Sequence, residues 1–122
     1  LAGSNRFGDA LGELMNIKYL GMSFSSKVVM FMNPDKAAVY DSIIAERIKR
    51  DPNLEFLYTK TTSSTPKDKV IQMNTYQRWC DFCSQSADLL CSRKSVWNDW
   101  DDRPHPFRAV DIERSFFALG RN

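Results

Sequence analysis

Apolar residues recur at the spacing of a helix in two separate stretches of the chain, and one of these stretches is long. The first stretch has an apolar face formed by Phe7, Leu11, Leu14 and Met15. The second begins after Thr65-Pro66, a pair typical of a helix start, and its face comprises Val70, Met73, Tyr76, Cys80, Cys83, Ala87, Leu90 and Cys91. No two segments alternate apolar and polar residues with the period of paired strands. The pattern therefore predicts an all-α fold.

The length and the breakers divide this helical chain into elements of one compact domain. With 122 residues the chain is too short for two ordinary domains, so we expect a single helical domain over 1–122. The predicted elements are a helical hairpin at about 8–32, a helix after Asp41, a polar loop at about 53–65, a long helix at about 66–93 and a C-terminal helix at about 108–119.

The second helix of the hairpin has two contrasting halves. Ser23 is positioned to cap it, and Asn33-Pro34 to end it. Its first turn is polar, whereas the block Val28–Met32 is apolar on every side. A helix that is apolar all round is usually buried, so we expect the block in the core and the first turn at the surface.

Charge and cysteine content bear on the class of protein rather than on its activity. The formal charge of +2 indicates neither a nucleic-acid binder nor a partner for acidic substrates. There is no run of about 18 apolar residues that could span a membrane and no signal peptide, so we expect an unexported protein of the cytoplasm or nucleus that does not bind membranes. Leu1 to Arg6 resembles interior sequence, which suggests a fragment of a longer protein.

The three cysteines lie within one short segment, and their odd number argues against a disulfide framework. Cys80 and Cys83 have the spacing of a redox motif but fall inside a predicted helix with no strand before it. A metal site would need a further ligand, and the only histidine, His105, lies between two prolines. We therefore expect packing roles for Cys80, Cys83 and Cys91, and neither a metal nor a cofactor.

The hairpin and the helix after it combine two features that suit DNA. The free backbone amides of the hairpin, and of the helix that starts near Ser23, can hold a phosphate, with Lys18 and Lys27 beside them. Asp41 precedes the third helix, where a carboxylate is favoured as an N-cap. We interpret this region as the candidate functional site.

These residues resemble the helix-hairpin-helix DNA glycosylases, most nearly the 8-oxoguanine DNA glycosylase-like proteins. The resemblance rests on Gly21-Met22-Ser23-Phe24-Ser25-Ser26-Lys27, on Ala38-Val39-Tyr40-Asp41-Ser42-Ile43 and on the segment 108–120, and it covers the first third and the last tenth of the chain. Enzymes of this family have a two-lobed helical body with the DNA cleft between the lobes. The chain would supply mainly one lobe, as a fragment or as a pared-down relative.

The resemblance assigns roles to individual residues. Asp41 would be catalytic, stabilising positive charge that develops on the sugar as the glycosidic bond breaks; the alternative role is a helix cap alone. Lys18, Gly21, Ser23, Ser25 and Lys27 would bind DNA. The expected function is base excision repair of an oxidised purine such as 8-oxoguanine, with or without lyase activity.

A departure from the family pattern concerns the lysine that forms a Schiff base with the sugar. A gapless match places Ser23 at that position, and the nearest amine belongs to Lys27, one helical turn later on the same face. Three alternatives follow: Lys27 is the nucleophile, Asp41 activates water without a lysine, or the protein only binds.

In the binding alternative the chain is a non-catalytic helical module for DNA or for a protein partner. The loop with Trp97 and Trp100 would then meet that partner, and Asp41 would only cap its helix. The aromatic residues to inspect for base stacking are Phe24, Trp79, Trp97 and Trp100.

Overall fold

The computed structural model describes residues 6–17, 20–62, 65–92, 97–98, 104–105 and 108–120, with side chains described for those in 6–90 and 108–115. The elements in chain order are α1 (Phe7–Met15), α2 (Met22–Met32), α3 (Ser42–Lys49), the 3-10 helix η2 (Pro52–Leu57), α4 (Pro66–Ser92), β1 (Trp97–Asn98), β2 (Pro104–His105) and α5 (Ala109–Gly120). The antiparallel pair β1–β2 has only two residues in each strand. The predicted all-α class is confirmed.

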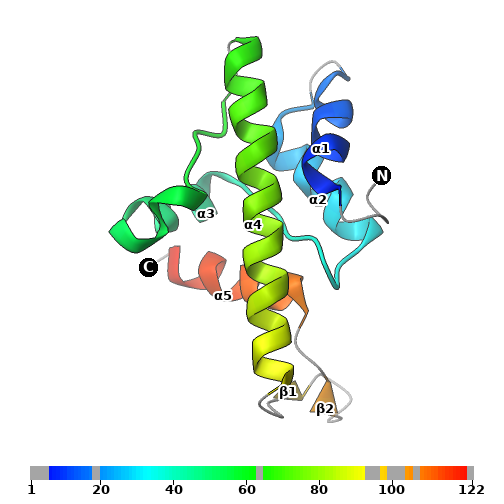
Figure 1. Cartoon of the computed structure of the whole chain (residues 1–122), viewed down its shortest axis with the longest axis vertical. Coiled ribbons are helices and arrows are strands. Elements are labelled where there is room, and N and C mark those ends of the chain that lie inside the picture. The colour runs from blue at the N-terminus through cyan, green and yellow to red at the C-terminus, as the bar shows by residue number, and fades with distance from the viewer. Residues whose placement is uncertain are drawn as a thin grey trace.

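Helix α4 is the central element, and α1, α5 and η2 pack against it. Figure 1 shows α1 and α2 to one side of α4 and α3 to the other, with α5 crossing α4. α1 packs on α4 and on α2, while α5 packs on both α3 and α4. The Thr65 side chain accepts a hydrogen bond from the Asp68 amide at 3.1 Å, which confirms the predicted start of the long helix.

Two glycines allow α1 to approach α4 closely. A Cβ atom added at Gly8 would lie 2.5 Å from the carbonyl oxygen of Met73, and one at Gly12 would lie 2.6 Å from the Met73 sulfur. The Gly8 amide also donates to Oε1 of Gln77 at 2.9 Å. The hairpin is therefore fixed to the central helix through its first member.

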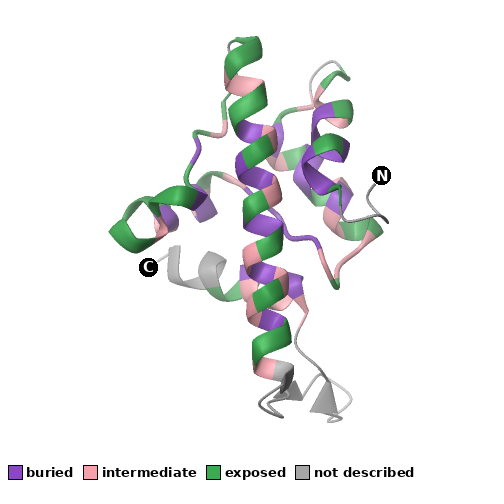
Figure 2. Ribbon diagram, in the orientation of Figure 1, coloured by how far each residue is buried: buried purple, intermediate pink, exposed green. Residues whose placement is uncertain are grey.

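The chain between α2 and α3 runs through the middle of the core in an irregular conformation. Residues 37–40 are all buried (Figure 2). The Ala37 amide donates to the Asn33 carbonyl, and side chains satisfy several of the other backbone groups. The Tyr76 hydroxyl donates to the Ala38 carbonyl at 2.7 Å, and Trp79 Nε1 donates to the Val39 carbonyl at 2.8 Å. We call residues 37–41 the buried segment; it is buried up to Tyr40 and ends at the half-buried Asp41.

Burial along α2 is the reverse of what its sequence predicts. Ser25 and Ser26 are fully buried, whereas Phe31 is 76% exposed and Met32 is 67% exposed. From the block expected in the core, only Val29 is buried. The prediction was wrong because the core beside α2 is occupied by the polar backbone of 37–41, which a serine hydroxyl can satisfy and a phenylalanine cannot.

Two further expectations about element boundaries were wrong. The N-cap of α2 is Gly21, with no side-chain cap, and Ser23 lies inside the first turn. The expected polar loop at 53–65 begins with most of η2, and it buries Leu57 and Thr59. The reason is Tyr40, whose hydroxyl donates to the Leu57 carbonyl at 2.8 Å and accepts from the Thr59 amide at 3.0 Å.

Other boundaries agree with the sequence. α2 ends at Met32, directly before Asn33-Pro34, and α3 starts directly after Asp41. Within the described residues, no helix is long and apolar enough to cross a membrane.

Candidate functional site

The first two turns of α2 and the segment that carries Asp41 are joined by a buried hydrogen bond. The Tyr40 amide donates to the Ser26 hydroxyl at 3.0 Å. That hydroxyl in turn lies within hydrogen-bonding distance of two carbonyls, 2.9 Å from Ser23 and 3.2 Å from Tyr40. Because Lys27 follows Ser26 and Asp41 follows Tyr40, this contact makes the backbones of Lys27 and Asp41 neighbours.

Asp41 is the N-cap of α3, as the sequence predicts. Its Oδ1 atom accepts a hydrogen bond from the Ile44 amide at 2.9 Å, and its backbone is extended at φ −124° and ψ −176°. The residue is half-buried. Within the described part of the chain the second carboxylate oxygen accepts no hydrogen bond, so capping leaves one oxygen for another partner.

Lys27 lies in the second turn of α2 and is exposed. Its ammonium group makes no ion pair with any residue that the structure describes. Around it α2 has no acidic residue, because the helix sequence is MSFSSKVVMFM. Lys27 is therefore a cation available to an anionic ligand.

The structure adds a residue that the sequence analysis did not single out. Glu113, on α5, is only 6% exposed, and its Oε1 atom accepts a hydrogen bond from the Val39 amide at 3.4 Å. A sequence signal was present, since Glu113 follows Ala109 by four positions and Val110 by three and so shares their buried face. An acid on the apolar face of a helix is an exception worth noting.

The electrostatic environment of Glu113 connects it with both predicted catalytic residues. Its pKa is raised to about 7, mainly by burial and to a smaller extent by the Asp41 charge. The Val39 hydrogen bond and the charges of Arg114 and Lys27 act in the opposite direction. Asp41 and Lys27 thus both act electrostatically on Glu113, and we call the three residues the Lys27–Asp41–Glu113 cluster.

The remaining predicted DNA-binding residues lie in different environments. Gly21 caps α2 and Ser23 is half-buried in its first turn. The Ser25 hydroxyl is fully buried and has no hydrogen-bond partner among the residues that the structure describes, so the expectation that this turn faces solvent was wrong at Ser25. Lys18 lies outside the described residues.

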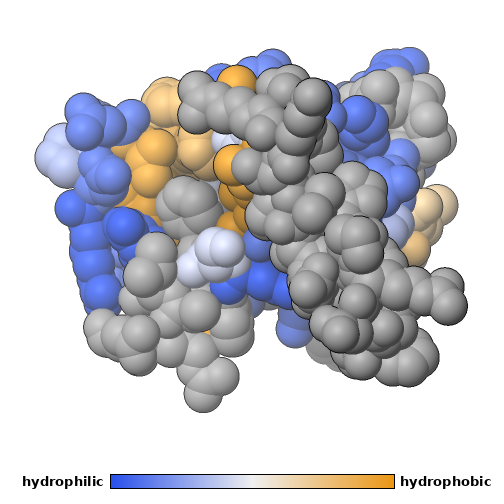
Figure 3. Space-filling model, turned by 90° about the horizontal axis from the view of Figure 1, so that it is seen from below, coloured by the Kyte–Doolittle hydropathy of each residue, from blue (hydrophilic) through white to orange (hydrophobic). Residues whose placement is uncertain are grey.

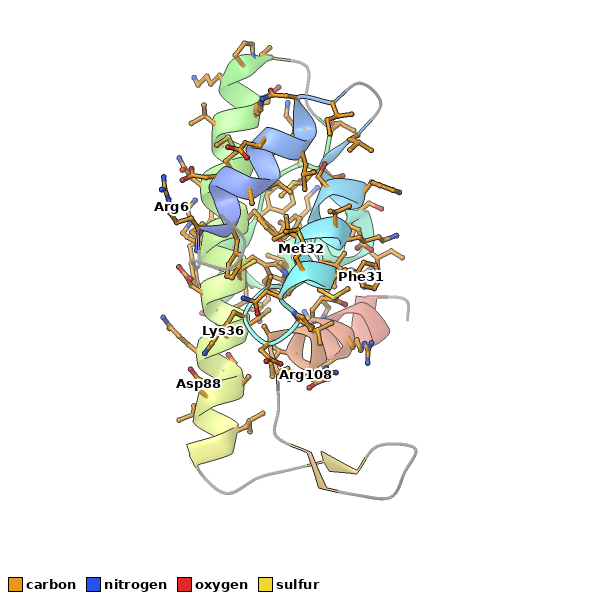
Figure 4. All side chains as sticks on the ribbon, turned by 90° about the vertical axis from the view of Figure 1, so that its right-hand side faces the viewer. Arg6, Phe31, Met32, Lys36, Asp88 and Arg108 are labelled. Carbon is orange, nitrogen blue, oxygen red and sulfur yellow. The ribbon has the colours of Figure 1, made fainter. Side chains whose placement is uncertain are left out.

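The outer face of α2 carries aromatic side chains. Phe24 is 57% exposed, and Phe31 lies seven positions later on the same face. Figure 4 shows Phe31 on the side of α2 away from α4. In the view from below, apolar residues reach the surface among hydrophilic ones (Figure 3).

The cysteines for which side chains are described occupy the core. Cys80 and Cys83 are free thiols, both fully buried, next to Trp79, which stacks on Phe82. Burial raises the pKa of Cys80 to about 12 and that of Cys83 well above its ordinary value, which suits packing and not redox chemistry.

No cluster of metal-ligating side chains occurs among the described residues. The expected packing role of Cys91 and the expected partner loop with Trp97 and Trp100 depend on side chains outside the described set, as does His105. Trp79, considered for base stacking, is fully buried, and its indole is a core group.

A surface hollow lies away from this cluster. It has a volume of about 360 Å³, and its lining includes Arg6 and Glu13 near α1 and Lys69 and Met73 on α4. It contains neither Lys27 nor Asp41, so it does not contribute to the candidate site.

Searches of protein-family models, curated proteins and solved structures found no match for the chain.

Proposed function

We propose that the chain is a DNA glycosylase-like protein of base excision repair that binds DNA through the α1–α2 hairpin and excises an oxidised purine such as 8-oxoguanine. One observation carries the proposal: the Ser26–Tyr40 hydrogen bond, which makes the backbones of Lys27 and Asp41 neighbours. Support also comes from the electrostatic effect of both residues on Glu113. An amine and a carboxylate are the two groups that Schiff-base excision requires.

DNA binding is assigned to the start of α2. The N-terminus of α2 has no side-chain cap, so its first amides and the helix dipole favour a phosphate. Lys27 adds a charge from the second turn, and α2 has no acidic residue to oppose it. These contacts would position DNA without reading its sequence.

The chemical step follows from the two remaining groups. The amine of Lys27, after its ammonium form has given up a proton, attacks C1′ of the sugar; the glycosidic bond breaks, and the base leaves with the bonding electrons and takes up a proton. Asp41 accepts the proton that the amine loses and stabilises positive charge on the sugar through its uncapped oxygen. The sugar ring then opens: the C1′–O4′ bond breaks, O4′ takes up a proton, and the nitrogen lone pair forms the C=N bond of the Schiff base.

The direct test is excision from a duplex oligonucleotide that contains 8-oxoguanine, with and without borohydride. We expect a borohydride-trapped adduct with the natural chain and none with Lys27→Ala. Asp41→Asn should lower the excision rate by about 100-fold or more, the scale on which acid–base groups contribute. No excision at all, or full activity in Asp41→Asn, would refute the proposal.

Two matched variants control for folding and for charge. Asp51→Asn changes another aspartate N-cap, whose side chain accepts from the Asn53 amide at 3.0 Å, and should leave excision unchanged. Lys49→Ala removes an exposed cation from the last turn of α3 and should leave trapping unchanged. Excision that persists in Lys27→Ala without trapping would assign the attack to water activated by Asp41.

The second candidate function is a non-catalytic binding module, and the exposed aromatic face of α2 favours it. In this case Asp41 is only the cap of α3. DNA binding that weakens steeply with salt but gives no excision would support a DNA-binding module. Absence of DNA binding at low salt would leave a protein partner for the outer face of α2.

A further inference from the structure

We propose that Glu113 is a positioning residue for Asp41. Its buried carboxyl accepts a hydrogen bond from the Val39 amide and thereby fixes the backbone at Asp41, which neighbours the backbone of Lys27. The inference extends the proposed function, because it names a residue that prepares the same site. Glu113 itself is buried and is not expected to touch DNA.

The geometry of the buried segment 37–41 supports this role. Its polar backbone groups are held by the Tyr76 hydroxyl, the Trp79 indole and the Ser26 hydroxyl, each with one fixed protonation state near neutral pH. The Val39 amide is held by the Glu113 carboxyl instead. Of these four side chains, Glu113 is therefore the one that can gain or lose a proton near neutral pH. Its bond is to Val39, two residues before Asp41.

Charged and titratable groups on several elements interact electrostatically with Glu113. They are Lys27 on α2, Asp41 at the end of the segment 37–41, Tyr76 and Cys83 on α4, and Arg114 on α5 itself. Burial is the largest cause of the raised pKa of about 7, so both protonation states of Glu113 are populated near neutral pH.

The two protonation states have different effects on the site. An ionised Glu113 accepts a stronger hydrogen bond from the Val39 amide and attracts Lys27, but it repels Asp41. A protonated Glu113 holds the amide more weakly and removes this repulsion. If Glu113 positions Asp41, a change in the protonation of Glu113 must alter the hydrogen bond between Asp41 and the Ile44 amide.

Two-dimensional ¹H–¹⁵N NMR of the full chain tests this directly, between about pH 5.5 and about pH 8.5, a range above the ordinary titration of exposed carboxylates. We expect the Val39 amide signal to shift with a midpoint near 7 because it bonds to the titrating carboxyl. The Ile44 amide, which bonds to Asp41, should shift with the same midpoint.

The variant Glu113→Gln keeps an acceptor oxygen for the Val39 amide but cannot titrate, so both shifts should disappear. The matched control Glu46→Gln removes an exposed carboxylate from α3 and should leave both shifts in place. A Val39 shift without an Ile44 shift would overturn the positioning role, and so would the absence of both in the natural chain.

This readout needs no DNA, so it separates the inference from the proposed function. Where excision is observed, its rate should change with pH, with the same midpoint near 7 as the two NMR shifts. Glu113→Gln should remove this change from the pH–rate profile. Excision without the two NMR shifts would overturn the role of Glu113 alone. The shifts without excision would refute the glycosylase proposal and retain the coupling between Glu113 and Asp41.

Discussion

The two faces of α2 differ in an unusual way: the polar face is buried and the aromatic face is exposed to solvent. The inner face includes Ser25 and Ser26, which are fully buried, while the outer face presents Phe24 and Phe31 to solvent. The difference teaches that burial in this domain follows hydrogen-bonding need as well as hydrophobicity. The inner face meets the backbone of 37–41, and a hydroxyl there can satisfy groups that an apolar side chain would leave unpaired.

The two buried serines are themselves unequal. The Ser26 hydroxyl accepts from the Tyr40 amide, whereas the Ser25 hydroxyl has no partner within the described part of the chain. The outer aromatic residues, by contrast, contribute little packing within the chain. The contribution of each α2 residue to stability should therefore follow its partners and not its hydrophobicity.

The largest effect is expected from Ser26→Ala, which leaves the Tyr40 amide buried and unpaired. The free energy of unfolding should fall by about 2–3 kcal/mol, measured by urea denaturation. Ser25→Ala is the matched control, since it removes a buried hydroxyl that has no partner and should be neutral or stabilising. Equal losses in the two variants would contradict the distinction between these serines.

The next effect concerns the pH dependence of stability. Glu113 has a pKa of about 7 in the folded chain against an ordinary value of 4.5, so the folded state binds more protons between these values. Stability should therefore fall as pH rises from about 4.5 to about 7, by roughly 2 kcal/mol, and remain lower above pH 7.

Glu113→Gln should remove this pH-dependent loss, so the variant should be more stable than the natural chain at about pH 8 and show a flatter profile. Urea denaturation at several pH values measures both chains. A natural chain that gains stability over the same pH interval, or a variant with an unchanged profile, would show that Glu113 is not held as a raised-pKa carboxyl.

The smallest effect is expected on the outer face. Phe31→Ser should change the free energy of unfolding by no more than about 0.5 kcal/mol, because the side chain is already in water. Val29→Ala, on the inner face of the same helix, should cost about 2 kcal/mol. A large loss in Phe31→Ser would mean that the outer face is covered by other parts of the protein.

Features that depend on neighbours in sequence could be predicted, and features that depend on distant segments could not. Asn33-Pro34 ends α2, and Thr65 and Asp41 cap their helices, because these effects act within a few residues. Helical spacing similarly gives the all-α class.

The reversed burial of α2, the η2 helix and Glu113 each arise from contacts across the fold. Ser26 is buried because Tyr40 needs a partner, and η2 follows from the bonds of the Tyr40 hydroxyl to 57 and 59. Glu113 joins the site only because α5 packs beside the segment 37–41. The pair Lys27 and Asp41 was predicted from a family resemblance, whereas the closeness of their backbones depends on the fold.

The central claim is that Lys27 and Asp41 act together on DNA, and a double-mutant cycle tests it most directly. Excision of 8-oxoguanine would be measured for the natural chain, Lys27→Ala, Asp41→Asn and the double variant. We expect the double variant to lose little more activity than the worse single variant, with a coupling free energy well above about 0.5 kcal/mol. Losses that add within that margin would show that the two residues act independently and would contradict the claim.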